Sequence, residues 1–112
     1  MVTLHLTDKK CVACEGTEAP LTGEQCKVYS EQVPEWKTAE DNKSISRQFK
    51  FKNFKEAIAF ANKIGDLAES EGHHPDLEVG WGRVGVHLST HAIKGLSEND
   101  FILAAKIDEI GK

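Results

Sequence analysis

The sequence predicts an α+β domain of two layers, in which helices cover one face of a four-stranded antiparallel sheet. Two stretches alternate apolar and polar residues around a turn signal, as β-hairpins do, and three others repeat apolar residues at helical spacing. Hairpins and helices without strand-helix-strand crossovers favour an antiparallel sheet. The expected order is α-β-β-α-β-β-α, and the uncovered face of the sheet is left for solvent, a ligand or a partner chain.

The length of 112 residues suits one domain with one hydrophobic core. Residues 1–20 show no clear periodicity, and we expect them to form an irregular N-terminal arm. Residues 21–112 are then the single folded domain.

The first helix is predicted after Thr22, because Thr22-Gly-Glu-Gln25 has the pattern of a capping box. Cys26, Tyr29 and Val33 follow on one helical stripe, and Pro34 ends the pattern.

Residues 36–51 are predicted to form the first hairpin, with its turn at Asp41-Asn42. The period of two places one set of alternate residues on the same face, namely Ile45, Arg47, Phe49 and Phe51.

The second helix is predicted to begin at the cap Asn53 and to stop at Gly72, because the residue after a helix often needs a positive φ. Its expected inward stripe comprises Phe54, Ala57, Ile58, Ala61, Ile64 or Gly65, Leu67 and Ala68.

The second hairpin is expected to turn at Gly82-Arg83. Its two alternating runs are Leu77, Val79 and Trp81, then Val84, Val86 and Leu88. We expect Trp81 to pack near the histidines described below, and His87 to lie on the open face of the sheet.

The last helix is capped by the run Ser97–Asp100. The residues expected to turn inward are Phe101, Ala104, Ala105 and Ile107 or Ile110.

Four of the five histidines lie between residues 73 and 91. Gly72 and Pro75 flank His73 and His74, so the pair is expected at an irregular junction from which both rings can reach one pocket. Pairing across the hairpin turn brings residues 74–77 beside residues 88–91. His73, His74 and His91 are therefore predicted to converge.

Three interpretations of this trio remain open. The histidines could have no role, they could bind a metal, or they could act in general acid–base catalysis on a small molecule. The usual zinc pattern of two histidines three to five residues apart is missing, since His73 and His74 are adjacent.

Composition excludes several classes of protein. The net charge of −4 argues against nucleic acid as a direct partner. No apolar run approaches the roughly 20 residues that span a bilayer, and the N-terminus lacks a secretory pattern, so we expect no membrane partner and a cytoplasmic location. The odd number of cysteines, three, also fits a reducing compartment.

The spacing around the histidines also has a recognisable order. An acidic residue, a His-His-Pro triplet, an aromatic residue, a histidine and an aspartate follow one another as Glu69, His73-His74-Pro75, Trp81, His91 and Asp100. This order resembles the signature of the pterin-4a-carbinolamine dehydratases, and residues 84–91 are similar to that family as well. The resemblance covers roughly residues 20–110.

The resemblance implies a hydro-lyase that acts on 4a-hydroxytetrahydrobiopterin. Aromatic amino acid hydroxylases leave their tetrahydropterin with a hydroxyl at C4a. The dehydratase removes this group as water and gives quinonoid dihydropterin for recycling. The reaction needs an acid and a base, and the pterin is the substrate, so no metal and no cofactor are implied.

The resemblance also implies roles for individual residues. His73 and His91 would be the proton donor and acceptor, in an order that stays open. His74 would be the third catalytic residue, which binds and orients the pterin and shares the proton work. Glu69 and Asp100 would hold imidazole rings in the needed tautomer, and Asp100 would cap a helix as well.

The implied substrate contacts further include Ser89 and Thr90 at the pocket rim, and Trp36 near the pterin. A Trp at the start of a strand is equally consistent with a core position. Members of the family form dimers or tetramers, so a homodimer or homotetramer is expected.

Two other hypotheses compete with the enzyme. In animals the family also supplies a dimerisation partner for a transcription factor, which would make the chain a non-catalytic binding module. Alternatively, Cys11 and Cys14 could bind zinc together with His5 or Cys26, although a single Cys-x-x-Cys is weak support.

Overall fold

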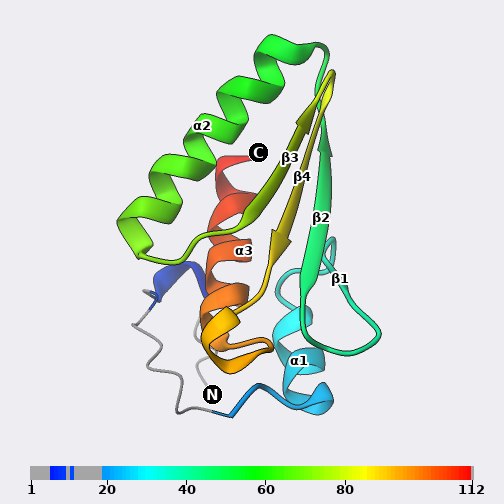
Figure 1. Ribbon diagram of the computed structural model, residues 1–112, viewed down its shortest axis with the longest axis vertical. Helices are drawn as coiled ribbons and strands as arrows, with labels where there is room; N and C mark the ends of the chain where they lie inside the picture. The colour runs from blue at the N-terminus through cyan, green and yellow to red at the C-terminus, as the bar shows by residue number, and fades with distance from the viewer. Residues whose placement is uncertain (1–5, 10, 12–18, 112) are drawn as a thin grey trace.

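The computed structural model describes residues 6–9, 11 and 19–111 (Figure 1). The helices are α1 (Gly23–Ser30), α2 (Phe54–Glu71) and α3 (Glu98–Ile110), with 3-10 turns η1 (Leu6–Asp8) and η2 (His91–Ile93). The strands are β1 (Lys37–Thr38), β2 (Ile45–Lys50), β3 (Asp76–Gly80) and β4 (Arg83–Leu88). None of the helices in these described ranges is long and apolar enough to cross a bilayer.

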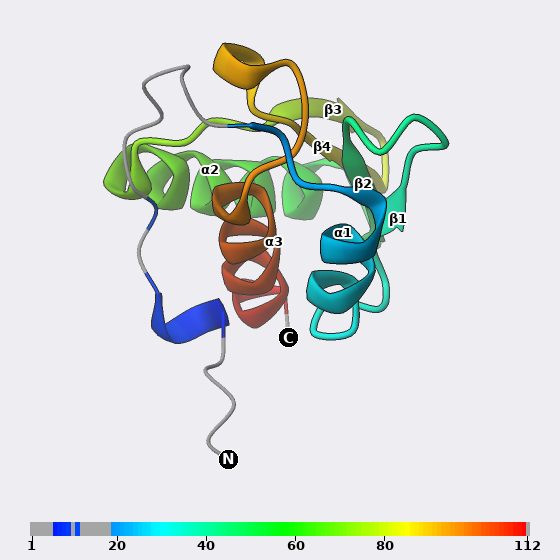
Figure 2. The same cartoon turned by 90° about the horizontal axis from the view of Figure 1, so that it is seen from below.

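The four strands form one antiparallel sheet in the order β1-β2-β4-β3. All three helices lie on the same side of this sheet, as the view from below in Figure 2 shows. The predicted fold class and element order are therefore confirmed. The register pairs Ile45 with Leu88 and Asp76 with His87. Strand β4, which leads to His91, therefore lies in the middle of the sheet between β2 and β3.

Helix α3 lies between α1 and α2 beneath the sheet (Figure 2). The single inward stripe expected for it is too narrow, because Ile102 and Leu103 are buried as well. The physical reason is that α3 has neighbours on several sides, since η1 packs against it in addition to the other helices. A helix surrounded in this way is apolar on more than one face.

Helix α2 begins and ends where the sequence predicts. Asn53 Oδ1 accepts a hydrogen bond from the backbone nitrogen of Glu56 at 2.9 Å, and Gly72 has a φ of 68° at the C-terminal cap. The predicted stripe is wrong at Phe54 and Ile58, which are 47% and 38% exposed. The missed residue is Phe60, whose ring is buried and approaches other aromatic rings on the sheet side.

The turn of the second hairpin is shifted by one residue from its predicted place. The loop residues are Trp81 and Gly82, and only Gly82 takes a positive φ, 71°. Trp81 is 74% exposed at the tip of the hairpin, at the opposite end of β4 from the histidines. Its expected packing near the histidines is therefore wrong.

The described part of the N-terminal arm packs on the domain. Leu6 is 2% exposed, and its backbone nitrogen donates a hydrogen bond to Gln32 Oε1 at 3.0 Å. The arm that the sequence predicts as irregular thus includes the 3-10 turn η1, while the division of the chain at residue 20 stays a prediction.

Candidate active site

The three converging histidines line one pocket. They belong to the segment that follows α2 and to η2 (orange), which lie toward the lower end of the sheet in Figure 1. His73 and His74 lie in the α2–β3 junction, and His91 opens η2. The pocket has a volume of about 260 Å³ and is lined by Gly72, His73, His74, Ser89, Thr90, His91, Ala92 and Asn99. The hairpin register thus brings the trio together as the sequence predicts.

The shortest polar contact at this pocket joins His73 to Asp100. The distance from Nε2 to Oδ1 is 2.6 Å, and the two side chains are 12% and 0% exposed. A carboxylate that accepts a hydrogen bond from Nε2–H favours the tautomer of the ring with its proton on Nε2. It leaves Nδ1 as the nitrogen that can exchange a proton with a substrate.

Asp100 is held in turn by donors on its second oxygen. Oδ2 accepts hydrogen bonds from Thr90 Oγ1 at 2.7 Å and from the backbone nitrogen of Ser97 at 2.9 Å. Asp100 lies in the first turn of α3, where the helix dipole also favours a negative charge. Thr90 is only 4% exposed, so the residue expected at the rim also supports the buried carboxylate.

The segment that carries His91 is closed by a backbone bridge between Thr90 and Gly95. Thr90 donates to the Gly95 carbonyl at 2.8 Å, and Gly95 donates back at 3.4 Å. A Cβ atom on Gly95 would lie 2.7 Å from the Cβ of Pro20, so no side chain fits there without movement. The exposed ring of His91 therefore projects from a loop with fixed ends.

The second predicted acid lies at the rim. Glu69 Oε1 is 3.6 Å from His74 Nε2, and the two side chains are 80% and 59% exposed. Such an exposed pair contributes little energy and leaves both side chains free to move. Ser89 is half-buried and lines the same pocket.

Trp36 does not line the pocket of the histidines. It is 4% exposed, and its Nε1 donates a hydrogen bond to Asp108 Oδ1 at 2.8 Å, near the C-terminal end of α3. Arg47 contacts the same oxygen at 2.7 Å. Burial raises the pKa of Asp108 more than Trp36 and Arg47 lower it.

Two residues near the pocket were missed by sequence reasoning. Asn99 lines the pocket and is 5% exposed. Glu71 ends α2 and pairs with Lys106 of α3 at 2.9 Å, with side chains 11% and 16% exposed. The sequence offered no signal for this pair, because 35 residues separate its members.

The described residues contain no group of three or more His, Cys, Asp and Glu side chains that suits a metal. Burial, followed by the charge of Glu71, raises the pKa of the Cys11 thiol to about 12. Cys11 and the buried Cys26 are the members of the zinc hypothesis that the structure describes. Cys14 and His5, the other members of the zinc hypothesis, lie outside the described residues.

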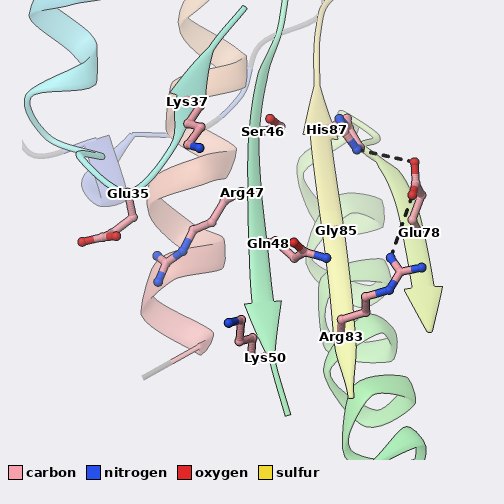
Figure 3. Close-up of a pocket in the computed structure, with 10 residues that line it drawn as sticks. All are labelled: Glu35, Lys37, Ser46, Arg47, Gln48, Lys50, Glu78, Arg83, Gly85 and His87. Carbon is pink, nitrogen blue, oxygen red and sulfur yellow. Dashed lines mark ion pairs between the residues drawn. The ribbon is translucent and has the colours of Figure 1, made fainter. Parts of the chain in front are cut away.

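A larger hollow lies on the open face of the sheet, with a volume of about 580 Å³ (Figure 3). It includes His87, which faces away from the helices as predicted and lies 3.7 Å from Glu78 Oε1. These two side chains are 48% and 69% exposed. The smaller pocket is the better candidate, because it has a histidine bonded to a buried carboxylate.

The chain is similar to known proteins over most of its length. Residues 19–110 match the family model described as pterin 4 alpha carbinolamine dehydratase. A relative from Halorhodospira halophila, provisionally named a pterin-4-alpha-carbinolamine dehydratase, is 49% identical over 96% of this chain and 99% of its own. A relative from Alkaliphilus metalliredigens with the same provisional name is 50% identical over 94% of this chain and 95% of its own.

Solved structures agree with these matches. A transcriptional coactivator/pterin dehydratase from Brucella melitensis superposes with a TM-score of 0.78 and 31% identity, over 83% of this chain and 99% of the other. A pterin dehydratase-like protein described as a RuBisCO assembly factor in the alpha-carboxysome has a TM-score of 0.59 at 22% identity, over 68% of this chain and 88% of its own. The latter likeness concerns the fold alone.

Proposed function

The chain belongs to the pterin 4 alpha carbinolamine dehydratase family, and we propose that it removes water from 4a-hydroxytetrahydropterins by histidine acid–base catalysis. Membership of this family indicates a hydro-lyase that acts on a pterin carbinolamine. The proposal adds the residues that move the protons.

The reaction is an elimination of water across N5 and C4a of the pterin. A base takes the proton from N5, the electron pair of that bond forms a double bond between N5 and C4a, and the bond from C4a to the hydroxyl oxygen breaks. An acid donates a proton to the departing hydroxyl, which leaves as water. Each proton transfer of this kind is worth about 10²–10⁴ in rate.

The observation that carries the proposal is the 2.6 Å contact between His73 and the fully buried Asp100. It orients the ring and keeps a proton on Nε2, so Nδ1 can serve the substrate in a fixed position. Preorganised geometry of this kind is what acid–base catalysis requires.

The other two histidines are proposed to complete the site. His91, which lines the same pocket, is the partner in proton transfer, and His74 binds and orients the pterin. Ser89 and Thr90 contribute polar contacts, while the exposed Glu69 acts on His74. The contact with the pterin that the family resemblance implies for Trp36 would require its ring, which is 4% exposed and bonded to Asp108, to become uncovered.

The wider setting is proposed from the family. The product would be quinonoid dihydropterin, and the reaction would return the pterin of aromatic amino acid hydroxylases to a reductase. We expect activity without any added metal or cofactor, in a cytoplasmic homodimer or homotetramer.

The test is the rate of dehydration of freshly generated 4a-hydroxytetrahydropterin, followed by ultraviolet absorbance. His73→Ala is compared with His87→Ala, a matched histidine outside the pocket. We expect wild type and His87→Ala to accelerate the reaction, and His73→Ala to lose about 10²–10⁴ of that acceleration while it stays folded. Equal rates for both variants, or no acceleration by wild type, would contradict the proposal.

The non-catalytic binding module remains the second candidate, because the fold is shared with a protein described as a RuBisCO assembly factor. The same assay separates the two. A binding module would not need the bonded pair of His73 and Asp100, and its function would survive His73→Ala.

A further inference from the structure

We infer that Glu71 and the N-terminal strap, defined here as residues 6–9 and 11, position His73 against Asp100. The strap lies outside residues 19–110, which match the family model. The inference rests on the proposed function, since positioning matters only if His73 and Asp100 work together on a substrate. It assigns Glu71 and Lys9 as positioning residues, and neither lines the pocket.

The pair needs support because its two members lie on different elements. His73 lies in the junction after α2, and Asp100 lies in the first turn of α3. Their 2.6 Å contact therefore depends on how the end of α2 is set against the start of α3. A shift of about 1 Å at a catalytic group can cost about 10²-fold in rate.

Glu71 ties the end of α2 to both neighbours. It stands two residues before His73, and its Oε2 pairs with Lys106 Nζ of α3 at 2.9 Å. Its other oxygen, Oε1, accepts a hydrogen bond from the backbone nitrogen of Cys11 at 2.9 Å. One carboxylate thus joins α2, α3 and the strap.

The electrostatics of Glu71 fit this role. Burial alone would raise the pKa of its carboxyl, but the Cys11 N–H and the Lys106 ammonium outweigh burial and lower the pKa below its usual 4.5. The ionised form is therefore the one that its surroundings favour at neutral pH.

The strap also contacts the start of α3. Lys9 Nζ lies 2.7 Å from Glu98 Oε2, and Tyr29 of α1 donates to the same oxygen at 2.9 Å. The Cys11 thiol donates to the carbonyl of Asn99 at 3.6 Å. These contacts hold the two residues that immediately precede Asp100.

The strap is itself anchored in the core. Leu6 is 2% exposed and belongs to the main hydrophobic cluster, and η1 lies alongside α3 in Figure 2. Displacement of the strap would therefore release the contacts to Glu71, Glu98 and Asn99 together.

The experiment compares Glu71→Gln and Lys9→Gln with two control variants on the exposed face of α2, Asp66→Asn and Lys63→Gln. Each variant is measured for kcat and KM of dehydration and for thermal unfolding. The proton on Nε2 of His73 is followed by nuclear magnetic resonance, because a short bond to a carboxylate moves this signal far downfield.

We expect Glu71→Gln to lower kcat about 10-fold and Lys9→Gln about 2- to 3-fold, with KM nearly unchanged. The downfield signal of His73 should shift or broaden in both variants and stay in place in both controls. A role in stability alone would change the melting temperature without moving kcat or this signal.

The inference is wrong if Glu71→Gln and Lys9→Gln both keep wild-type kcat and an unshifted His73 signal. Should Glu71→Gln fail to fold, Lys9→Gln decides the question, because Lys9 is partly exposed and its loss removes one ion pair. If wild type shows no dehydration, the proposed function fails, whereas the His73 signal still tests the positioning.

Discussion

Two of the histidine–carboxylate pairs among the described residues lie in contrasting surroundings. His73 and Asp100 lie 2.6 Å apart, with the carboxylate fully buried among donors. On the open face, His87 and Glu78 lie 3.7 Å apart, and both side chains are about half or more exposed. Both pairs join an imidazole to a carboxylate, yet of the two only His73–Asp100 has one geometry imposed on it.

The difference shows what would distinguish the catalytic pair proposed here from a common surface ion pair. In water, two mobile side chains lose entropy when they pair, so the exposed pair fixes neither tautomer nor ring position. In the interior, hydrogen bonds from Thr90 and Ser97 fix the Asp100 carboxylate. This carboxylate in turn fixes the position of the His73 ring. The two pairs therefore serve as internal controls for each other.

The largest expected effect comes from Asp100→Asn. The amide keeps the shape of the side chain but removes the charge that stabilises a protonated ring, and it can donate where the carboxylate only accepts. We expect kcat for dehydration to fall by about 10²–10⁴. Glu78→Gln makes the same change on the open face and should keep wild-type kcat. Comparable losses in both variants would remove the distinction between the two pairs.

The next effect concerns the donors around Asp100. Thr90→Val removes a hydroxyl that donates to Oδ2 at 2.7 Å, and a buried charge then loses one partner. We expect the free energy of unfolding to fall by about 1–3 kcal/mol in denaturant titrations. Thr38→Val is the control, since its hydroxyl makes a longer 3.4 Å contact with Ser30, and its change should stay within about 0.5 kcal/mol.

A third effect extends the comparison to pH. The pKa of Glu71 is lower in the folded protein than its usual 4.5, so the unfolded chain takes up the proton first. The stability that Glu71 contributes is complete above that value and is lost as pH falls through the lower folded pKa.

Urea unfolding at a series of acidic pH values checks this prediction. Glu71→Gln should reduce the dependence of stability on pH in this range. Glu78→Gln, which changes an exposed carboxylate, should retain the slope of wild type. If the stability of Glu71→Gln depended on pH as strongly as that of wild type, the contacts from Cys11 and Lys106 would not stabilise the ionised carboxylate of Glu71.

The smallest effect is expected on the open face itself. Removal of His87 or Glu78 should change the free energy of unfolding by about 0.5 kcal/mol or less, and added salt should diminish even that change. Thermal unfolding at low and high ionic strength measures it. A loss above about 2 kcal/mol would mean that this face is covered in solution.

The features that local sequence signals determine were predicted well. The capping box of Thr22 and Gln25 forms, and the stop at Gly72 is present. The meeting of the three histidines was predictable too, because antiparallel pairing relates residue positions by simple counting once a hairpin is recognised. The one-residue error in the predicted position of the turn did not change which histidines meet.

The features that tertiary packing determines were not predictable. Phe60 is buried and Phe54 is exposed because of where α2 meets the rings of the sheet, and either residue satisfies helical spacing. The contacts of Glu71 with Cys11 and Lys106 join segments that are 60 and 35 residues away. No periodicity in one sequence encodes such pairs, and they determine how His73 meets Asp100.

The backbone bridge between Thr90 and Gly95 has a consequence for protein engineering. Its two ends are held together, so the exposed Ala92 and Lys94 can be varied while His91 stays in place and Thr90 keeps its bond to Asp100. Ala92 lines the pocket from this loop and is the natural first position for a mutant library. Selection on pterins with bulkier side chains should therefore yield changes in the loop while the buried acid and its donors stay untouched.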